Sequence, residues 1–333
     1  MRRLLRTIAA MAAAGIVIPA AASAPLVQAA VVTQHLGLRL MGVPASQAHN
    51  PRALRYIVDY LPPGAVIHRR ILIGNQGPAT ERATVYPDAA RIRNGSFVGD
   101  AGQTRSELTS WITLRRHAYN LRRGASVPDM VTIRVPRRAS RGERYGVIWV
   151  QHAVHARGAG GAAVNKVSRV GIRIYLAVGR GAAPPTRVAI TAIAGHRYAG
   201  GRPLLTASVT NTGGRAVDLS GTARLTAGPG PASAGPFQQA RAITLAPGQS
   251  GTVTFAAGRQ LASGPWRDQV TLVSGLTTVT AAASINFSAR PARAARISTA
   301  AMIGSVGIVI VLVALLTVWA RRRRGLQPRR ELA

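Results

Sequence analysis

The sequence predicts an all-β fold, with two immunoglobulin-like β-sandwich domains and one transmembrane helix near the C-terminus. Short segments of alternating apolar and polar residues recur along most of the 333 residues, separated by Gly, Pro and Asn turns. Helical periodicity is absent outside the two ends, and one stretch near the C-terminus has no charge. A chain of this length can bury two ordinary cores. It has no cysteine, which excludes a disulfide framework and thiol chemistry.

The N-terminus has the pattern of an export signal. Arg2, Arg3 and Arg6 precede a largely apolar run over 8–22, and small residues follow up to Ala29. This order predicts a signal peptide over 1–29 that is removed on export. The residues after it are expected to fold outside the cytoplasm.

The C-terminal region predicts a membrane anchor. Residues 300–320 contain no charged side chain and, as a helix, would span about 30 Å, the thickness of a bilayer core. Four arginines follow at once, and the positive-inside rule places them in the cytoplasm: Arg321, Arg322, Arg323 and Arg324. We therefore expect a basic juxtamembrane stalk over 290–299, a transmembrane helix over 300–320 and a cytoplasmic basic tail over 321–333. The protein would be a single-pass type I protein of the cell membrane, with its bulk facing the cell wall.

The first sandwich is predicted over 30–183. Apolar residues alternate with polar or small residues over 170–178 and 131–135, as in half-buried strands. Residues 145–151 are more continuously apolar, which predicts a central strand covered on both faces. A Gly- and Pro-rich stretch over 179–185 is the expected linker.

The second sandwich is predicted over 184–289, where a new series of alternating segments begins. Both domains contain a strand that ends in an Asn/Gly turn, at Asn75 and at Asn211. Both also contain a Pro-Gly turn, at Gly64 and Gly248, but in the opposite order along the chain. This pattern indicates two related sandwiches rather than a tandem repeat.

The charge is strongly positive and unevenly divided. The chain has 43 Lys and Arg against 10 Asp and Glu, and Lys166 is its single lysine. Residues 30–183 carry 23 cations and 7 acids, whereas 184–289 carry 8 and 2. Such a charge favours polyanionic partners, but export removes nucleic acid from the candidates. Wall polymers and lipid headgroups remain, and a solvated basic surface with no specific partner is the alternative.

The stretch from about residue 45 to 150 resembles the peptidoglycan-binding domain of the WxL-interacting surface proteins of Gram-positive bacteria. The segments that carry the resemblance are, in order, 56–60 ahead of Pro63-Gly64, 71–75, 83–89, 111–112, 131–136 and 142–148. The arginine-rich composition suggests an actinobacterial-type relative. The resemblance implies a signal peptide, two immunoglobulin-like domains, one transmembrane helix, a basic tail and peptidoglycan binding by the first domain.

No motif in the sequence favours an enzyme. The Gly-x-Ser-x-Gly elbow of serine hydrolases is absent. His152 and His155 lie three apart in a strand, so they point to opposite faces, and no carboxylate is near them in sequence. We expect no catalytic residue, no metal site and no cofactor.

Aromatic and basic residues of the first domain are the candidate ligand-binding residues. Trp111 stands among polar residues and is expected at the surface, where it could stack on a sugar, whereas Trp149 is expected in the core. Arginines cluster around it in sequence and could pair with an anionic polymer. The candidate set is Trp111, Arg115, Arg116, Arg134, Arg137, Arg138, Arg141 and Arg144.

Three hypotheses on function follow. The leading one is a non-enzymatic, membrane-anchored cell-surface protein whose outer domain binds peptidoglycan or associated anionic wall polymers. The alternative is a surface scaffold or chaperone-like module that captures a secreted protein partner by strand addition at an exposed edge. The third, an accessory part of a membrane enzyme or transporter, would require the anchor helix to pack against another span.

Overall fold

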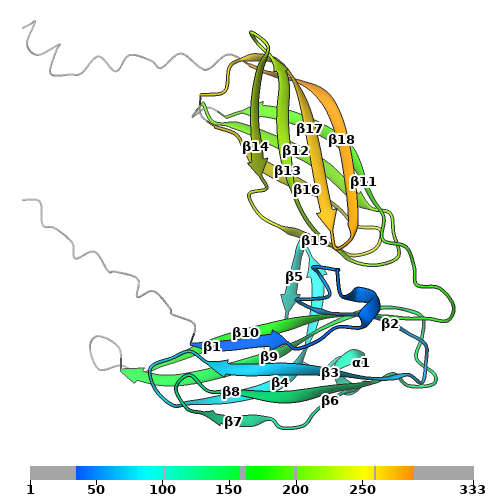
Figure 1. Ribbon diagram of the computed structural model, residues 1–333, viewed down its shortest axis with the longest axis vertical. Helices are drawn as coiled ribbons and strands as arrows, with labels where there is room; N and C mark the ends of the chain where they lie inside the picture. The colour runs from blue at the N-terminus through cyan, green and yellow to red at the C-terminus, as the bar shows by residue number, and fades with distance from the viewer. Residues whose placement is uncertain (1–34, 101, 158–162, 199–200, 259, 289–333) are drawn as a thin grey trace, which may run out of the picture.

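The computed structural model describes residues 35–100, 102–157, 163–198, 201–258 and 260–288, and only the backbone in the parts of 154–166 that it covers. These residues form two β-sandwiches, shown one above the other in Figure 1. The prediction of an all-β fold is confirmed, and the predicted division at 183/184 falls between the last strand of one sandwich and the first strand of the next. The predicted signal peptide, stalk, transmembrane helix and tail lie outside the described residues. Within those residues, no helix has the length and apolar character that a bilayer crossing requires.

The first domain consists of two facing sheets. One sheet has the order β1 (Leu36–Leu40), β3 (Val66–Asn75), β8 (Ser126–Arg134), β6 (Ile112–Leu114). The other has the order β2 (Ile57–Leu61), β10 (Ala163–Val178), β9 (Gly142–Arg157), β4 (Glu81–Arg93), β5 (Ser96–Gly99), and β7 (Ala118–Leu121) also pairs with β4. A short helix, α1 (Glu107–Ser110), and a 3-10 turn, η1 (Ala45–Gln47), lie in the connections.

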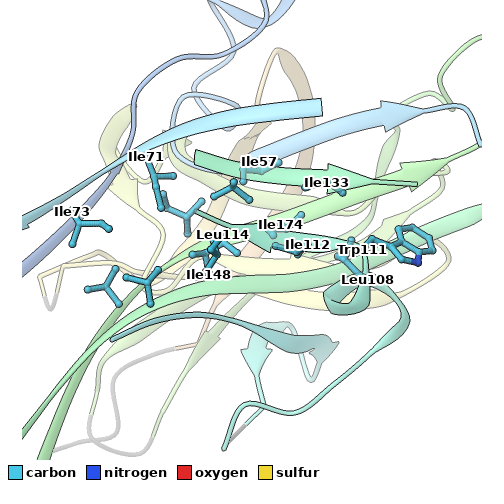
Figure 2. Close-up of a cluster of buried hydrophobic side chains, with 14 of the residues drawn as sticks. Ile57, Ile71, Ile73, Leu108, Trp111, Ile112, Leu114, Ile133, Ile148 and Ile174 are labelled. Atoms are coloured by element: carbon cyan, nitrogen blue, oxygen red, sulfur yellow. The ribbon is translucent and has the colours of Figure 1, made fainter. Parts of the chain in front are cut away.

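Alternation along the strands builds the core of the first domain. Val131 and Ile133 of β8 face Ile148 of β9 and Ile174 of β10 across the sandwich, and all four are fully buried. Figure 2 shows this cluster, with the isoleucines of both sheets between the layers. The prediction that 145–151 forms a central strand is confirmed, because β9 lies between β10 and β4.

The second domain is also a two-layer sandwich. One sheet has the order β11 (Val188–Arg197), β12 (Pro203–Asn211), β16 (Ser250–Ala256). The other has the order β14 (Ala232–Gln238), β13 (Val217–Gly228), β17 (Gly264–Ser274), β18 (Thr277–Phe287), and β15 (Ile243–Leu245) also pairs with β13. Its core centres on Phe255, Trp266 and Phe287.

In each domain an asparagine at the end of a strand makes the same set of hydrogen bonds, an arrangement that we call the asparagine corner. The amide nitrogen of Asn75 donates to the carbonyls of Ala79 at 2.7 Å and Leu121 at 2.9 Å. The amide nitrogen of Asn211 donates to the carbonyls of Arg215 at 2.8 Å and Leu245 at 3.0 Å. In both domains the side-chain oxygen accepts the N–H of the glycine two residues on, at 2.8 and 3.0 Å.

The asparagine corner corrects the expected order of the Asn/Gly turn and the glycine turn along the chain. The backbone of Asn211 accepts from Gly248 N, and the backbone of Asn75 accepts from Gly124 N. Gly124 and Gly248 both have positive φ, 71° and 76°. The structural counterpart of Gly248 is therefore Gly124 and not Gly64, so the two turns follow in the same order in both domains.

Candidate protein-interaction site

One edge of the second sheet of the first domain is only partly covered. β10 pairs with β9 along its whole length on one side, from Ala163 opposite Arg157 to Val178 opposite Gly142. On the other side, only Ile174–Val178 has a partner, the parallel strand β2. Within the described part of the chain no further strand pairs with β10. The outward N–H and C=O groups over 167–173 therefore lack a ladder partner.

The course of the chain explains why this edge is open. β1 pairs with β3 in one sheet, and β2 pairs with β10 in the other. The chain crosses between the sheets over 41–56, a connection that contains η1 and the prolines Pro44 and Pro51. Proline has no N–H to give to a ladder. β1 lies near β10 across the corner of the sandwich but forms no ladder with it.

The inward side of this edge is apolar. Ile172 is buried in the core of the first domain, and Val170 packs against that core. Leu38 and Leu40 of β1 are partly buried against the same cluster. A strand added beside β10 would place alternate side chains over this apolar strip.

The outward side of the edge is basic and has an exposed apolar residue at its start. Val167 is 53% exposed, and Arg169 and Arg173 are half-buried. Gly171 lies between the two arginines because a Cβ there would come within 2.6 Å of the Trp149 ring. Arg169 lies over the same ring, 4.5 Å from its centroid. Trp149 is thus partly buried on the outer face of the sheet, and not in the core as expected.

The edge leads into the contact between the domains, which centres on Asp218 of β13. Arg52 donates from Nε to Oδ2 of Asp218 at 2.6 Å, and Arg52 also lies over the Tyr175 ring. The hydroxyls of Tyr175 and Thr244 donate to Oδ1 at 2.8 and 2.7 Å. Arg173 donates to Oδ1 at 3.3 Å. Asp218 therefore links β10 and the connection over 41–56 of the first domain to the second domain.

Glu143 of β9 makes a second contact between the domains, in which an acid of the first domain accepts from the second domain. Its Oε2 accepts the backbone N–H of Ala216 at 2.6 Å and the hydroxyl of Tyr145 at 2.8 Å. Burial raises the pKa of Glu143, against the opposing effect of those two hydrogen bonds. Burial also lowers the pKa of the neighbouring Arg215. Each domain thus places one acid against the other domain.

A hollow of about 570 Å³ lies between the domains beside these residues. Arg52, Arg55 and Arg173 line it from the first domain, and Asp218 is the acid of its lining. Arg173 is also the last residue of the unpaired stretch of β10. The open edge and the hollow therefore form one continuous basic surface.

Trp111 is not at the surface, so its predicted position is wrong. It is 6% exposed and belongs to the core, where Figure 2 shows it beside Leu108. Arg144 lies 4.9 Å from its ring centroid and pairs with Glu107 at 2.8 Å. Polar neighbours in the sequence suggested exposure, but Trp111 is the C-cap of α1 and its ring packs into the core of the first domain.

The other predicted arginines form two separate groups. Arg134, Arg137, Arg138 and Arg141 are exposed on and after the end of β8. Arg115 and Arg116 are exposed beyond the opposite end of the β6–β8 ladder, near Tyr119 and Asp129. Binding of a wall polymer by either group stays a prediction.

The fold also brings together residues that the sequence did not connect. His152 Nε2 lies 2.5 Å from Glu81 Oε2, and His152 Nδ1 lies 3.2 Å from the carbonyl of Arg82. His35 lies 3.7 Å from Glu81 Oε1. A carboxylate therefore does accompany His152, contrary to the sequence-based interpretation. No trio of His, Asp or Glu in the described parts of the chain is arranged to hold a metal ion.

Comparison with known proteins yields no assignment by sequence and only distant similarities by structure. No protein-family model matches the chain, and no curated protein matches it. The E. coli chaperone DraB is 14% identical, with a TM-score of 0.38 over 74% of this chain and 96% of that one. A Salmonella enterica SafA pilin–SafB chaperone structure is 10% identical, with a TM-score of 0.39 over 74% and 96%. Pseudomonas aeruginosa CupB2 chaperone is 7% identical, with a TM-score of 0.37 over 70% and 99%. These scores are too low to carry a conclusion, so function is argued from the geometry of this chain.

Proposed function

We propose that this protein is an exported, membrane-anchored module that captures a secreted or surface protein by strand addition along β10. The observation that carries the proposal is that β10 has no ladder partner along its outer edge over 167–173, while its other edge is fully paired with β9. A strand edge of this kind is a template for a further strand. The main-chain hydrogen bonds of such a strand supply affinity, and its alternate side chains supply specificity.

The geometry favours capture of a polypeptide over binding of a wall polymer. Strand addition uses an edge, an apolar strip and a basic outer row that are contiguous on β10. A stacking site for sugar was expected at Trp111, and that ring is buried. Peptidoglycan binding and kinship with the WxL-interacting proteins remain predictions that rest on the sequence resemblance.

Site-directed cross-linking tests the proposal. The chain has no cysteine, so Val167→Cys introduces its single thiol, on the open edge of β10. A photoreactive group attached there should give discrete protein adducts from the exported proteins of the source cells, both before and after enzymatic digestion of the wall. Hydrogen exchange on the isolated adduct should then show protection of the amides over 167–173.

The matched control is Val98→Cys, which lies on β5 at the other side of the same sheet and is 42% exposed. Identical adducts from both positions, or an adduct that leaves 167–173 unprotected, would contradict strand addition at β10.

A further inference from the structure

The residues around the open edge of β10 restrict the chemistry of the strand that it can accept, and the following inference rests on the proposed function. We infer that the partner strand alternates acidic side chains with small apolar ones, with an acid facing Arg169.

The first argument is the two-faced character of the edge. A strand paired with β10 must turn alternate residues toward Val170 and Ile172 and the others toward Arg169 and Arg173. The first row meets the apolar strip that Leu38 and Leu40 of β1 continue. The second row meets the guanidinium group of Arg169, and Arg173, which donates to Asp218, follows four residues on along the same face.

The second argument is the distribution of charge. Between Glu143 and Asp218 the sequence has no acidic residue, yet it contains ten Lys and Arg residues. Glu143 and Asp218 are themselves engaged at the domain contact, and Asp88 beneath Arg169 is fully buried. Arg173 is paired with Asp218, and Asp88 acts on Arg169 only through its charge, so no described acid forms an ion pair with Arg169. A partner strand therefore approaches a positive surface at Arg169.

The third argument is that the arginines are held in place before a partner arrives. Arg169 lies against Trp149, and Arg173 lies about 5 Å from the rings of Tyr56 and Phe97. Stacking leaves the edges of a guanidinium group available for hydrogen bonds to carboxylates. Side chains that are already ordered lose less conformational entropy on binding. An acidic cross-strand neighbour would thus be favoured over a serine or a lysine.

Synthetic strand peptides test this inference on the full chain. Three nine-residue peptides would keep valine at alternate positions and carry aspartate, serine or lysine at the others. We expect the aspartate peptide to bind about tenfold more tightly than the serine peptide and the lysine peptide to bind least, from cross-strand charge pairs. Calorimetry measures the affinities, and hydrogen exchange checks that the amides over 167–173 become protected. Raising the salt concentration should shrink the preference for aspartate.

Two variants test whether the preference for the aspartate peptide comes from the open edge of β10. Arg169→Ser should lower the affinity for the aspartate peptide by about fivefold and leave that for the serine peptide unchanged. Arg224→Ser, at an exposed arginine on β13 of the second domain, should change neither.

The outcomes separate the two proposals. Equal binding of the three peptides with protection over 167–173 would overturn the acidic preference and leave strand addition standing. Binding without protection of that segment, or no binding at all, would count against both. An aspartate preference that survives Arg169→Ser would overturn the assignment to that arginine.

Discussion

Asp268 is a single residue whose burial strongly disfavours the ionised form of its carboxyl group. It lies on β17 between Trp266 and Val270, is fully buried, and faces the core of the second domain. Neither of its carboxylate oxygens meets a hydrogen-bond donor among the described residues. Burial alone raises the pKa of Asp268 to about 6.

The second domain should therefore lose stability as the pH rises. The folded state holds the Asp268 proton more tightly than the unfolded state, whose pKa is about 3.9. The stability is fully present below about pH 4 and falls as the pH passes through about 6, by roughly 3 kcal/mol. Asp268→Asn cannot ionise, so the variant should be more stable than the native chain at pH 7.5 and similar at pH 4. Urea unfolding read by hydrogen exchange of the β17 amides checks this, and an equal slope with pH in both proteins would contradict it.

Two strand-to-turn corners illustrate the scale of the element. Asn75 and Asn211 each hold one turn and the end of a distant strand through three hydrogen bonds that are largely buried. No other side chain of that size carries both a double donor and an acceptor at one end. The position therefore demands asparagine for reasons of geometry, and not merely of turn propensity.

Replacing either asparagine should loosen its own domain only. Asn75→Ala and Asn211→Ala each leave buried carbonyls without a donor, and we expect a loss of about 3 kcal/mol in the free energy of unfolding. Asn286→Ala, at an exposed asparagine on β18, should cost less than about 0.5 kcal/mol. Domain-resolved hydrogen exchange is the measurement. A loss in the unmutated domain, or no loss at all, would be inconsistent with a local role.

The elements also show where the sequence sufficed. Alternation over 170–178 predicts a strand because the spacing of apolar residues is a local property, and β10 has those bounds at its C-terminal end. The open edge of β10 depends on which strands pair with it, and pairing partners distant in the sequence leave no local signal. The Glu81–His152 contact was missed for the same reason. The prediction for Trp111 was wrong for a different reason. Exposure was inferred from its polar neighbours Ser110 and Thr113, which are exposed, whereas the Trp111 ring packs into the core.

At the scale of the whole molecule, a small apolar cluster and a few polar contacts join the two sandwiches. Val58, Ile92 and Tyr175 of the first domain pack with Ala216 of the second. Asp218 accepts from four side chains, and three of them belong to the first domain. The turn between β4 and β5 adds one backbone contact, since Thr244 N donates to the carbonyl of Gly95 at 2.9 Å. In Figure 1 this turn reaches up to β15 at the junction of the domains.

Asp218→Asn should therefore release the two domains from their fixed orientation. It leaves Arg52, which is 8% exposed, without its counter-charge, and breaking such a buried pair costs roughly 3–5 kcal/mol. Small-angle scattering should show a broader distribution of shapes, and the melting temperature should fall. Asp100→Asn breaks a pair whose arginine, Arg91, is 55% exposed, and should change little. If the two variants scattered and melted alike, Asp218 would not be what holds the domains.

The packing of Trp149 provides the molecule with an optical reporter of its own. Its indole lies against Gly171 on the strand with the open edge and beneath Arg169, whereas Trp111 and Trp266 are buried in the two cores. Indole emission shifts with the polarity around the ring and is quenched by neighbouring charged groups. A polypeptide that pairs with β10 would displace water from Trp149 and leave the two core tryptophans unchanged. Arrival of a partner could thus be followed by fluorescence on the unlabelled chain, in real time.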